Sequence, residues 1–584
     1  MTIPDFRTVS SGGSISSGAS GPRSRWKRGV GRILLGVPIF FALSQILIWT
    51  VWKPKWADSE KNVVTIMQVI LGTLCLFTWW FFCSPASWRT RLTGGGIILG
   101  ALLAWGLSIR SMELSGDMVP LIEYRWQPSA EQKFAAYHAR QQVLATGKPG
   151  IVEIPEIQPE EMPAYRGIHR DGIVIGSPVR TDWKSSPPVE IWRHPVGGGY
   201  ASMAVVGNLL VTLEQRGKDE AVVCYDTVSG REHWSFQYPA NFFEAMGGAG
   251  PRSTPTISGD AVFAFGAFGD LHCLDLRTGA PRWHVNALQQ FRVANTDWGM
   301  SCSPLVHEHR VIVNIGGPQG NGLIAYEIAH GDVAWYTAGL SPPETTLTSF
   351  QTGVAALPEE VSGKSVPGYS SPQFSEIAGK TLILNLDGTA LRGHDPQTGD
   401  MLWSVPFENQ PHVNVAQPIV FPDGRVLISA SYDVGSKMLQ VTEAAGHWNV
   451  KELWANRNLR CKFTSPVLVE GHLYGLDEGI LVCLDPEDGK RLWKGGRTGL
   501  KGRYGHGQLL ATGDLILVLT EPGEAVLIQA DPSQLRELER FRVLPVGKNW
   551  NPFTLCRGML YVRNVSEMAC FDVRIFPERS NGAP

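Results

Sequence analysis

A spaced motif that recurs five times constrains this sequence more than any other feature. Each copy consists of an acidic residue, a glycine four positions later and a tryptophan four positions after the glycine. The five copies are Asp226–Trp234, Asp275–Trp283, Glu327–Trp335, Asp395–Trp403 and Asp485–Trp493. Repeats at intervals of about 40 to 50 residues are typical of β-propellers and related arrays. The motif therefore predicts a repetitive β architecture.

The residues around the motif predict strands joined by a tight turn. A short alternating strand precedes each acidic residue, as in Ala221–Asp226 and Ile480–Asp485. The glycine of the motif provides the positive φ that the turn requires. We expect the strand after the turn to present its tryptophan to the neighbouring blade. Ser-Pro or Thr-Pro pairs, such as Thr254-Pro255, open other strands, because proline fits the first residue of a strand.

These units number eight, which predicts an eight-bladed propeller over residues 164–576. The fifth unit reaches Trp454 by a longer route, and the seventh keeps Asp531 but lacks the glycine and the tryptophan. The eighth ends at Asp572 without its own outer strand. Val189–Val196 could supply that strand and close the ring, which would remove exposed sheet edges. The units begin near Ala201, Gly250, Gly299, Gly368, Asn414, Phe463, Arg503 and Asn549.

Three apolar runs precede the repeats: Ile33–Trp52, Val63–Cys83 and Leu92–Ile109. Each has about the 17 to 25 residues that cross a bilayer, and no polar face interrupts them. We therefore predict three transmembrane helices within residues 32–110. The first run is too long for the apolar region of a typical signal peptide, so we interpret it as an anchor. Residues 1–31 are rich in serine and glycine and then basic, which predicts a disordered cytoplasmic arm.

The distribution of positive charge predicts the orientation. The basic arm and the short loop that carries Arg89 and Arg91 belong in the cytoplasm, although Lys53, Lys55 and Lys61 argue mildly against this. With three crossings, the propeller would lie on the periplasmic side of a bacterial inner (plasma) membrane.

Residues 111–163 connect the two parts. A capping-box pattern at Ser129–Gln132 begins a predicted helix over 129–146, and a Pro-rich linker follows at Glu153–Pro163.

Composition excludes several classes of function. The nine cysteines include no adjacent pair and no C-x-x-C, which argues against a zinc site, a thioredoxin-like centre and a covalent c-type haem. Cys224, Cys273, Cys483 and Cys570 each precede an acidic residue by two positions, so we expect them in the core. The net charge is −2, and no basic stripe mixed with aromatics follows the first 60 residues. We therefore expect no nucleic-acid partner.

Polar residues gather just before the predicted strands, where they should converge near the propeller axis. A funnel lined by such groups is a plausible ligand site. The residues are Glu214, Gln215, Arg216, Glu244, Arg252, Asp297, Trp298, Asn314, Asn414, Gln417, Lys462, Asp477, Glu478, Arg503, Tyr504, His506 and Asn551. Each also has a structural interpretation, since charged residues at blade ends often form ion pairs and Trp298 could pack between blades.

The pattern A-x-D-x-x-T-G-x-x-x-W resembles the tryptophan-docking motif of quinoprotein propellers, over roughly Tyr165 to Val573. That group includes pyrroloquinoline quinone (PQQ) dehydrogenases and the non-catalytic propeller lipoprotein of outer-membrane β-barrel assembly. Further stretches are similar to unassigned PQQ-like repeat proteins of bacteria: residues 165–172, 214–217, 247–256, 298–305, 414–418, 463–467 and 503–508. The resemblance implies the fold. The adjacent-cysteine ring of many alcohol dehydrogenases in this group is absent.

The resemblance also implies a possible cofactor, PQQ with Ca²⁺. Trp298 could stack on the quinone, and Arg252, Lys462 or Arg503 could pair with its carboxylates. Asp297 is the candidate general base. Calcium would need oxygen ligands, for which the candidates are Glu214, Asp297, Asn314 and Asp477. The candidate cofactor-binding residues are Glu214, Arg216, Arg252, Trp298, Asn314, Lys462, Arg503 and His506.

Two functions fit these observations. The first is a membrane-anchored scaffold whose propeller binds a protein, peptide or saccharide. The second is a PQQ-dependent dehydrogenase that oxidises an alcohol or sugar and passes electrons to membrane quinone. The missing adjacent cysteines and haem motif favour the scaffold, whereas the anchor and the axial charged residues favour the enzyme. We favour binding at the axis, by a protein partner or a small molecule.

Overall fold

The structure is a computed structural model that divides into two units. The first contains Met1–Arg110 and Asp117–Val119, and the second contains Ser111–Gly116 and Pro120–Pro584. The predicted disordered arm, residues 1–31, lies outside the described residues. Those residues are 39–51, 58–84, 86–144, 154–317, 319–341, 365–496 and 501–574.

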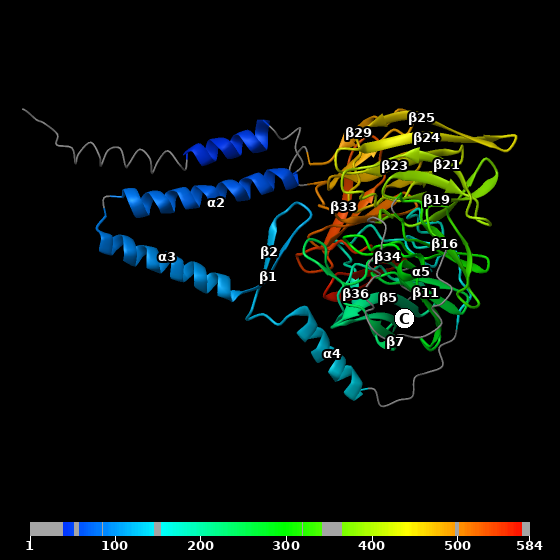
Figure 1. Ribbon diagram of the computed structural model, residues 1–584, viewed down its shortest axis with the longest axis horizontal. Helices are drawn as coiled ribbons and strands as arrows, with labels where there is room; N and C mark the ends of the chain where they lie inside the picture. Colours follow the sequence, from blue (N-terminus) through cyan, green and yellow to red (C-terminus); the bar gives the residue numbers. More distant parts are fainter. Residues whose placement is uncertain are drawn as a thin grey trace, which may run out of the picture. The chain divides into compact units, whose positions relative to one another are not determined.

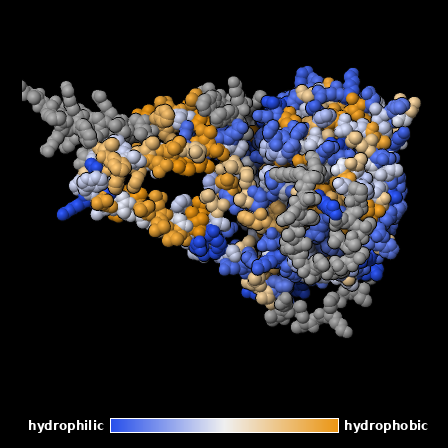
Figure 2. Space-filling model, in the orientation of Figure 1, coloured by the Kyte–Doolittle hydropathy of each residue, from blue (hydrophilic) through white to orange (hydrophobic). Residues whose placement is uncertain are grey.

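Two helices of the first unit are long and apolar enough to cross a bilayer: α2 (Asp58–Cys83) and α3 (Trp88–Ser108). Apolar side chains are exposed along both, and Figure 2 shows them gathered there. An exposed apolar surface of this extent marks a contact with lipid or protein. The first predicted run is helical over Ile39–Thr50 within the described residues, with the π-helix η1 at Leu47–Val51. That stretch is shorter than a span, so the third crossing stays a prediction.

A small hairpin and a helix come before the propeller. The hairpin consists of β1 (Ile109–Leu114) and β2 (Pro120–Tyr124), and the helix is α4 (Ala130–Leu144). The Ser129 hydroxyl accepts from the Gln132 amide at 3.1 Å, and the Gln132 side chain accepts from the Ser129 amide at 2.9 Å. This reciprocal pair satisfies two free donors and confirms the predicted helix start.

Eight four-stranded antiparallel sheets form the propeller. The first four blades comprise β4 (Ala204–Val206), β5 (Leu209–Arg216), β6 (Asp219–Asp226), β7 (Glu232–Pro239); β10 (Thr256–Ser258), β11 (Ala261–Phe265), β12 (Asp270–Asp275), β13 (Pro281–Asn286); β14 (Leu305–His307), β15 (Arg310–Asn314), β16 (Leu323–Glu327), β17 (Val333–Tyr336); and β18 (Gln373–Ile377), β19 (Lys380–Leu386), β20 (Ala390–His394), β21 (Met401–Pro406). The last four comprise β22 (Ile419–Val420), β23 (Arg425–Ala430), β24 (Gly435–Ala444), β25 (His447–Asn456); β26 (Val467–Val469), β27 (His472–Asp477), β28 (Ile480–Leu484), β29 (Arg491–Lys494); β30 (Gln508–Thr512), β31 (Leu515–Leu519), β32 (Glu524–Gln529), β33 (Arg536–Arg542); and β34 (Thr554–Cys556), β35 (Met559–Arg563), β36 (Glu567–Asp572), β3 (Val189–Pro195). Between blades lie the short strands β8 (Phe243–Glu244) and β9 (Gly248–Ala249) and the helix α5 (Ala287–Phe291).

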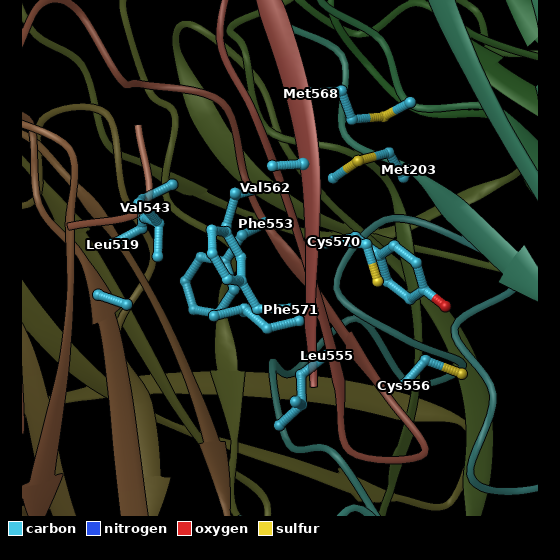
Figure 3. Close-up of a cluster of buried hydrophobic side chains, with 14 of the residues drawn as sticks. Met203, Leu519, Val543, Phe553, Leu555, Cys556, Val562, Met568, Cys570 and Phe571 are labelled. Atoms are coloured by element: carbon cyan, nitrogen blue, oxygen red, sulfur yellow. The ribbon is translucent and has the colours of Figure 1, made fainter. Parts of the chain in front are cut away.

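The ring closes as predicted, because β3 is the outer strand of the eighth blade. It pairs antiparallel with β36, and Trp192 stands opposite Cys570. Figure 1 shows the C-terminal strands, in red, beside β5 of the first blade. A core cluster joins blades seven, eight and one there, and Figure 3 shows part of it, with Met203 beside Met568 and Phe553 beside Phe571. Closure gives the eighth blade its fourth strand, so that the free edges of the ring are the short outer strands of the blades.

The motif tryptophans join each blade to the next. In six blades the indole N–H donates to a backbone carbonyl of the following blade. The pairs are Trp192–Thr227, Trp234–Leu276, Trp283–Ile328, Trp335–Pro396, Trp454–Pro486 and Trp493–Asp531. The indole lies against the turn glycine, so that a Cβ at Gly230 would be 2.7 Å from the Trp192 ring. This glycine is needed for space as well as for its φ of +68°.

The predicted core cysteines are buried opposite these tryptophans. Cys224 faces Trp234, and Cys273 faces Trp283 across the neighbouring strand. Burial raises the pKa of both thiols, that of Cys273 to about 12. A thiol with a raised pKa is a poor nucleophile, so these cysteines act as packing residues.

Candidate functional site

One end of the propeller axis is filled by the chain itself. The Arg170 guanidinium, 2% exposed, donates to the carbonyls of Ser303 at 2.9 Å and Pro372 at 2.8 Å. Arg166 donates to the carbonyls of Pro466 and Leu509, both at 3.0 Å. Burial lowers the pKa of both guanidiniums, that of Arg170 to about 10. These bonds reach the inner strands of blades three, four, six and seven, so the segment fills the axis.

At the other end, the connections that lead into the inner strands bring aromatic rings together. Tyr200 stacks on Trp550 at 5.8 Å between ring centroids, and Phe463 lies 4.8 Å from Trp550. Trp298 meets Tyr369 edge to face at 5.9 Å. These rings come from the connections into blades one, three, four, six and eight. We call this surface the axial face and define it by these rings and the three cations described next.

Three cations lie against the rings of the axial face. The Arg252 guanidinium is 4.6 Å from the ring centroid of Phe242. Lys462 Nζ is 5.4 Å from the Phe463 ring, and Lys548 Nζ is 5.1 Å from the Trp550 ring. Such cation–π contacts are each worth about 0.5 to 2 kcal/mol. Cations and rings therefore form one contiguous surface.

Arg252 differs from its neighbours in its hydrogen bonds. It donates to the carbonyls of Gly250 at 2.5 Å and Gly248 at 3.3 Å, and within the described residues no carboxylate forms an ion pair with it. Burial lowers the pKa of this guanidinium. A half-buried arginine held only by carbonyls is well placed to receive a carboxylate from a ligand, in a bidentate pair.

A buried carboxylate, Glu521, completes the face. One of its oxygens accepts from the Trp550 indole at 3.0 Å and from the Gly116 amide at 2.7 Å. The other accepts from the His506 amide at 3.0 Å. The ring of His506 meets Phe463 edge to face at 5.4 Å. Glu521 thus fixes the connections into blades seven and eight while also holding a backbone N–H of the hairpin segment.

The structure brings four of the predicted residues to this face: Arg252, Trp298, Lys462 and His506. Arg252 and Trp298 stand close together, since a Cβ at Gly247 would be 2.7 Å from one and 3.3 Å from the other. Sequence patterns did not predict Glu521, Lys548 or Trp550. Lys548 lies one residue before the start of the eighth unit, and Trp550 stands inside that unit beside Asn551, which the alignment did select.

Glu214 and Arg216 serve the blade interior instead. They form an ion pair at 3.1 Å, and Glu214 also accepts from the Tyr225 hydroxyl at 2.7 Å and the Gly197 amide at 3.0 Å. Burial raises the pKa of Glu214, but the positive charges of Arg216 and Arg563 outweigh it and leave that pKa below its ordinary value. These contacts tie blade one to blade eight.

Other predicted residues are also engaged by the fold. The Asn314 amide donates to the Pro367 carbonyl at 2.8 Å and its oxygen accepts from the Gly316 amide at 3.0 Å. Asp477 is buried and bonded to Arg460 at 2.8 Å, to Arg491 and to Lys494. Asp297 is exposed, and Arg503 is half-buried in a backbone bridge with Ile480.

These placements test the predicted calcium ligands. Glu214, Asn314 and Asp477 have their oxygens bound by neighbouring donors, and they lie in three different blades. Across the described residues, no group of three or more His, Cys, Asp or Glu side chains is arranged to hold a metal ion. Glu214, Asn314 and Asp477 therefore do not form a calcium site together, and we derive no catalytic step through PQQ.

Comparisons with known proteins agree with the fold. Residues 218–495 match the PQQ_2 family model, described as outer membrane protein assembly factor BamB. No curated protein matches the sequence. The crystal structure of BamB from Moraxella catarrhalis is similar at 16% identity and a TM-score of 0.44, covering 67% of this chain and 99% of that one.

Two enzymes have similar folds. A europium-containing methanol dehydrogenase matches at 12% identity and a TM-score of 0.41, covering 69% of this chain and 90% of its own. The quinohemoprotein alcohol dehydrogenase from Comamonas testosteroni matches at 14% identity and a TM-score of 0.41, covering 77% and 85%. Similarity this distant concerns the fold alone, so the function has to be argued from the axial face.

Proposed function

We propose that this eight-bladed PQQ-like propeller is a binding and scaffold module, which holds a protein partner at its axial face. The observation that carries the proposal is the grouping of Arg252, Lys462 and Lys548 with aromatic rings at one end of the axis. Aromatic residues and arginine dominate the binding energy of protein interfaces. The cations select a partner with carboxylates, and the rings supply apolar contact.

We further propose that the module is anchored in a bacterial inner membrane with the propeller on the periplasmic side. Helices α2 and α3 have the length and the apolar surface of an anchor, and Arg89 and Arg91, which the sequence placed in a loop and the structure places in the first turn of α3, fit the cytoplasmic end of that helix. The first apolar run would add the third span. An anchored propeller would hold its partner close to the membrane surface.

Photocrosslinking from the axial face tests the binding role. A photoreactive phenylalanine replaces Trp298 in the full chain, and a matched control carries it at Val228, a 64% exposed residue of the turn between β6 and β7. We expect one crosslinked protein from position 298 and none from 228. Arg252→Gln removes a cation of the face and should abolish that crosslink. Equal crosslinking from both positions, or crosslinking unaffected by Arg252→Gln, would contradict the proposal.

A PQQ-dependent dehydrogenase is the second candidate, because Arg252, Lys462 and Lys548 would also suit the carboxylates of a quinone, with Trp298 able to stack on its ring. Asp297 remains the candidate base for this function, and Arg503 and His506 remain candidate cofactor ligands. Titration of the full chain with PQQ and Ca²⁺, followed by dye reduction with alcohols and sugars, tests it. Saturable binding with turnover would favour the enzyme over the scaffold.

A further inference from the structure

A segment of the chain already occupies part of the axial face. Ser111–Gly116, the end of β1 and the start of its turn, belongs to the same unit as the propeller. The Gly116 amide donates to Glu521 at 2.7 Å, and the Gly116 carbonyl accepts from Lys462 Nζ at 3.2 Å. Glu113 pairs with Lys548 Nζ at 3.0 Å. The face thus binds the backbone N–H and C=O of one residue, Gly116, and one carboxylate through an ion pair.

The fit at Gly116 is strict. A Cβ at this position would overlap the His506 ring, and Gly116 has no neighbouring space in that direction. His506 is 2% exposed, packs against Phe463 and has its own amide bonded to Glu521, so the ring has little room to retreat. Only glycine allows the backbone to lie this close to the ring.

The groups that hold the segment need an occupant. Glu521 is 6% exposed and Lys548 is 5% exposed. A buried charge that loses its ion-pair partner is destabilising, and without Glu113 the Lys548 ammonium keeps its hydrogen bond to the Met246 carbonyl at 3.0 Å. The face therefore suits a turn that brings a carboxylate together with a backbone N–H and C=O. In this chain the carboxylate belongs to a Glu and the backbone groups to a Gly three residues later.

We infer that the axial face recognises an acidic turn of the form Glu-x-x-Gly, and that Ser111–Gly116 is its occupant in cis until a partner protein displaces it. The inference rests on the proposed binding function and names the chemistry of its ligand. A partner has one contact to gain, because the hydrogen bonds of Arg252 to the described residues all go to carbonyls and its other contacts are with rings. A second carboxylate in the partner would pair with that guanidinium. A tethered segment competes at an effective concentration of about millimolar, so it sets the affinity that a partner must exceed.

The test uses the full chain in lipid nanodiscs and a fluorescent cyclic peptide of residues 109–124. Gly116→Ala in the chain places a methyl group against His506 and should release the segment. The matched control is Gly547→Ala, because an added Cβ there has no neighbour within 4 Å. We expect Gly116→Ala to bind the peptide at least tenfold more tightly than the wild type and Gly547→Ala do. Peptides carrying Glu113→Gln or Gly116→Ala should lose most of this affinity.

Hydrogen exchange supplies a readout that is independent of the peptide. The Gly116 amide should be protected in the wild type and in Gly547→Ala, and exposed in Gly116→Ala. Equal peptide affinity and equal exchange in all three chains would overturn the inference, as would a released segment whose peptide does not bind. The absence of a crosslinked partner at Trp298 is a separate result and would count against the proposed function itself.

Discussion

Buried ionisable groups between blades one and two are the residues most sensitive to pH. The Glu220 carboxylate accepts from the Tyr238 hydroxyl at 2.7 Å and from the Ala267 amide at 3.2 Å. Burial nevertheless raises its pKa to about 7. Nearby, burial and the adjacent His284 lower the pKa of His272 to about 3. The two shifts act on stability with opposite signs.

Glu220→Gln should make the propeller less sensitive to rising pH. Between about pH 4.5 and 7 the folded state keeps a proton on Glu220 that the unfolded state has lost, so the free energy of unfolding falls as pH rises through this window. The loss is on the order of 3 kcal/mol. Urea unfolding of both chains at pH 5 and 7.5 measures it. His272 contributes equally to both chains, so its effect cancels in the difference between their free energies of unfolding. If that difference is the same at both pH values, the raised pKa does not belong to Glu220.

The repeated turn is the element that sequence predicted best. The fixed acid, glycine and tryptophan spacing located five of the eight blades, because the turn geometry depends on local residues, and the strand patterns around it located the other three. The fifth blade shows a consequence that the pattern does not predict: its irregular turn affects the tryptophan of blade four. Its long hairpin of β24 and β25 replaces the usual turn, and among the described residues the indole N–H of Trp403 in blade four has no hydrogen-bond partner.

Gly279→Ala should destabilise the propeller by more than its φ alone explains. Its φ is +70°, and an added Cβ would overlap the Trp234 indole of the preceding blade. Gly259→Ala is the matched control, because its φ is +56° but an added Cβ has no neighbour within 4 Å. Overpacking typically costs about 1 to 3 kcal/mol. We expect the thermal midpoint of Gly279→Ala to fall well below that of Gly259→Ala. Equal midpoints would show that the Trp234 indole moves aside to make room for the added methyl group.

The axial segment was harder to predict. Tyr165–Asp171 has no regular secondary structure, and its function depends on carbonyls of blades far along the chain. The hairpin β1–β2 was missed for the same reason, since its strands are short and its partners, Glu521 and Lys548, are distant in sequence. Of the rings and cations that define the axial face, sequence patterns identified Arg252, Trp298 and Lys462, which lie just before predicted strands. Glu521, which lies in the loop between β31 and β32, belongs to no repeated sequence pattern.

Arg170→Ala should cost several kcal/mol of stability. The substitution leaves the carbonyls of Ser303 and Pro372 without the donor they have in the axis, while the Pro304 carbonyl keeps the Thr256 hydroxyl. Each unpaired buried group costs about 1 to 3 kcal/mol. Arg277→Ala at an exposed arginine serves as the control. Calorimetry of both chains measures the change, and Arg170→Lys should lie between them because one ammonium cannot reach all three carbonyls. If Arg170→Ala melts at the same temperature as Arg277→Ala, the hydrogen bonds of Arg170 in the axis do not stabilise the propeller.

At the scale of the whole molecule, membrane orientation was predicted from charge, and its test is labelling. The seven cysteines of the propeller are buried. A maleimide should therefore label an introduced surface cysteine with little labelling of the native ones. A membrane-impermeant maleimide added to spheroplasts of a bacterial host should label Val228→Cys, in the propeller. Arg89→Cys, in the first turn of α3, should react only after the membrane is broken. The reverse labelling pattern would contradict the predicted orientation.

Closure of the ring by β3 has a consequence for synthesis. Arg193 of β3 forms an ion pair with Glu567, 374 residues later in the chain. Ribosomes add roughly 5 to 20 residues per second, so β3 waits about 20 to 75 seconds for its partner strand. Throughout that time the nascent chain carries an unpaired strand edge, which is a site for aggregation. Protection of the emerging chain by a holding chaperone would therefore matter most just before the last blade is made.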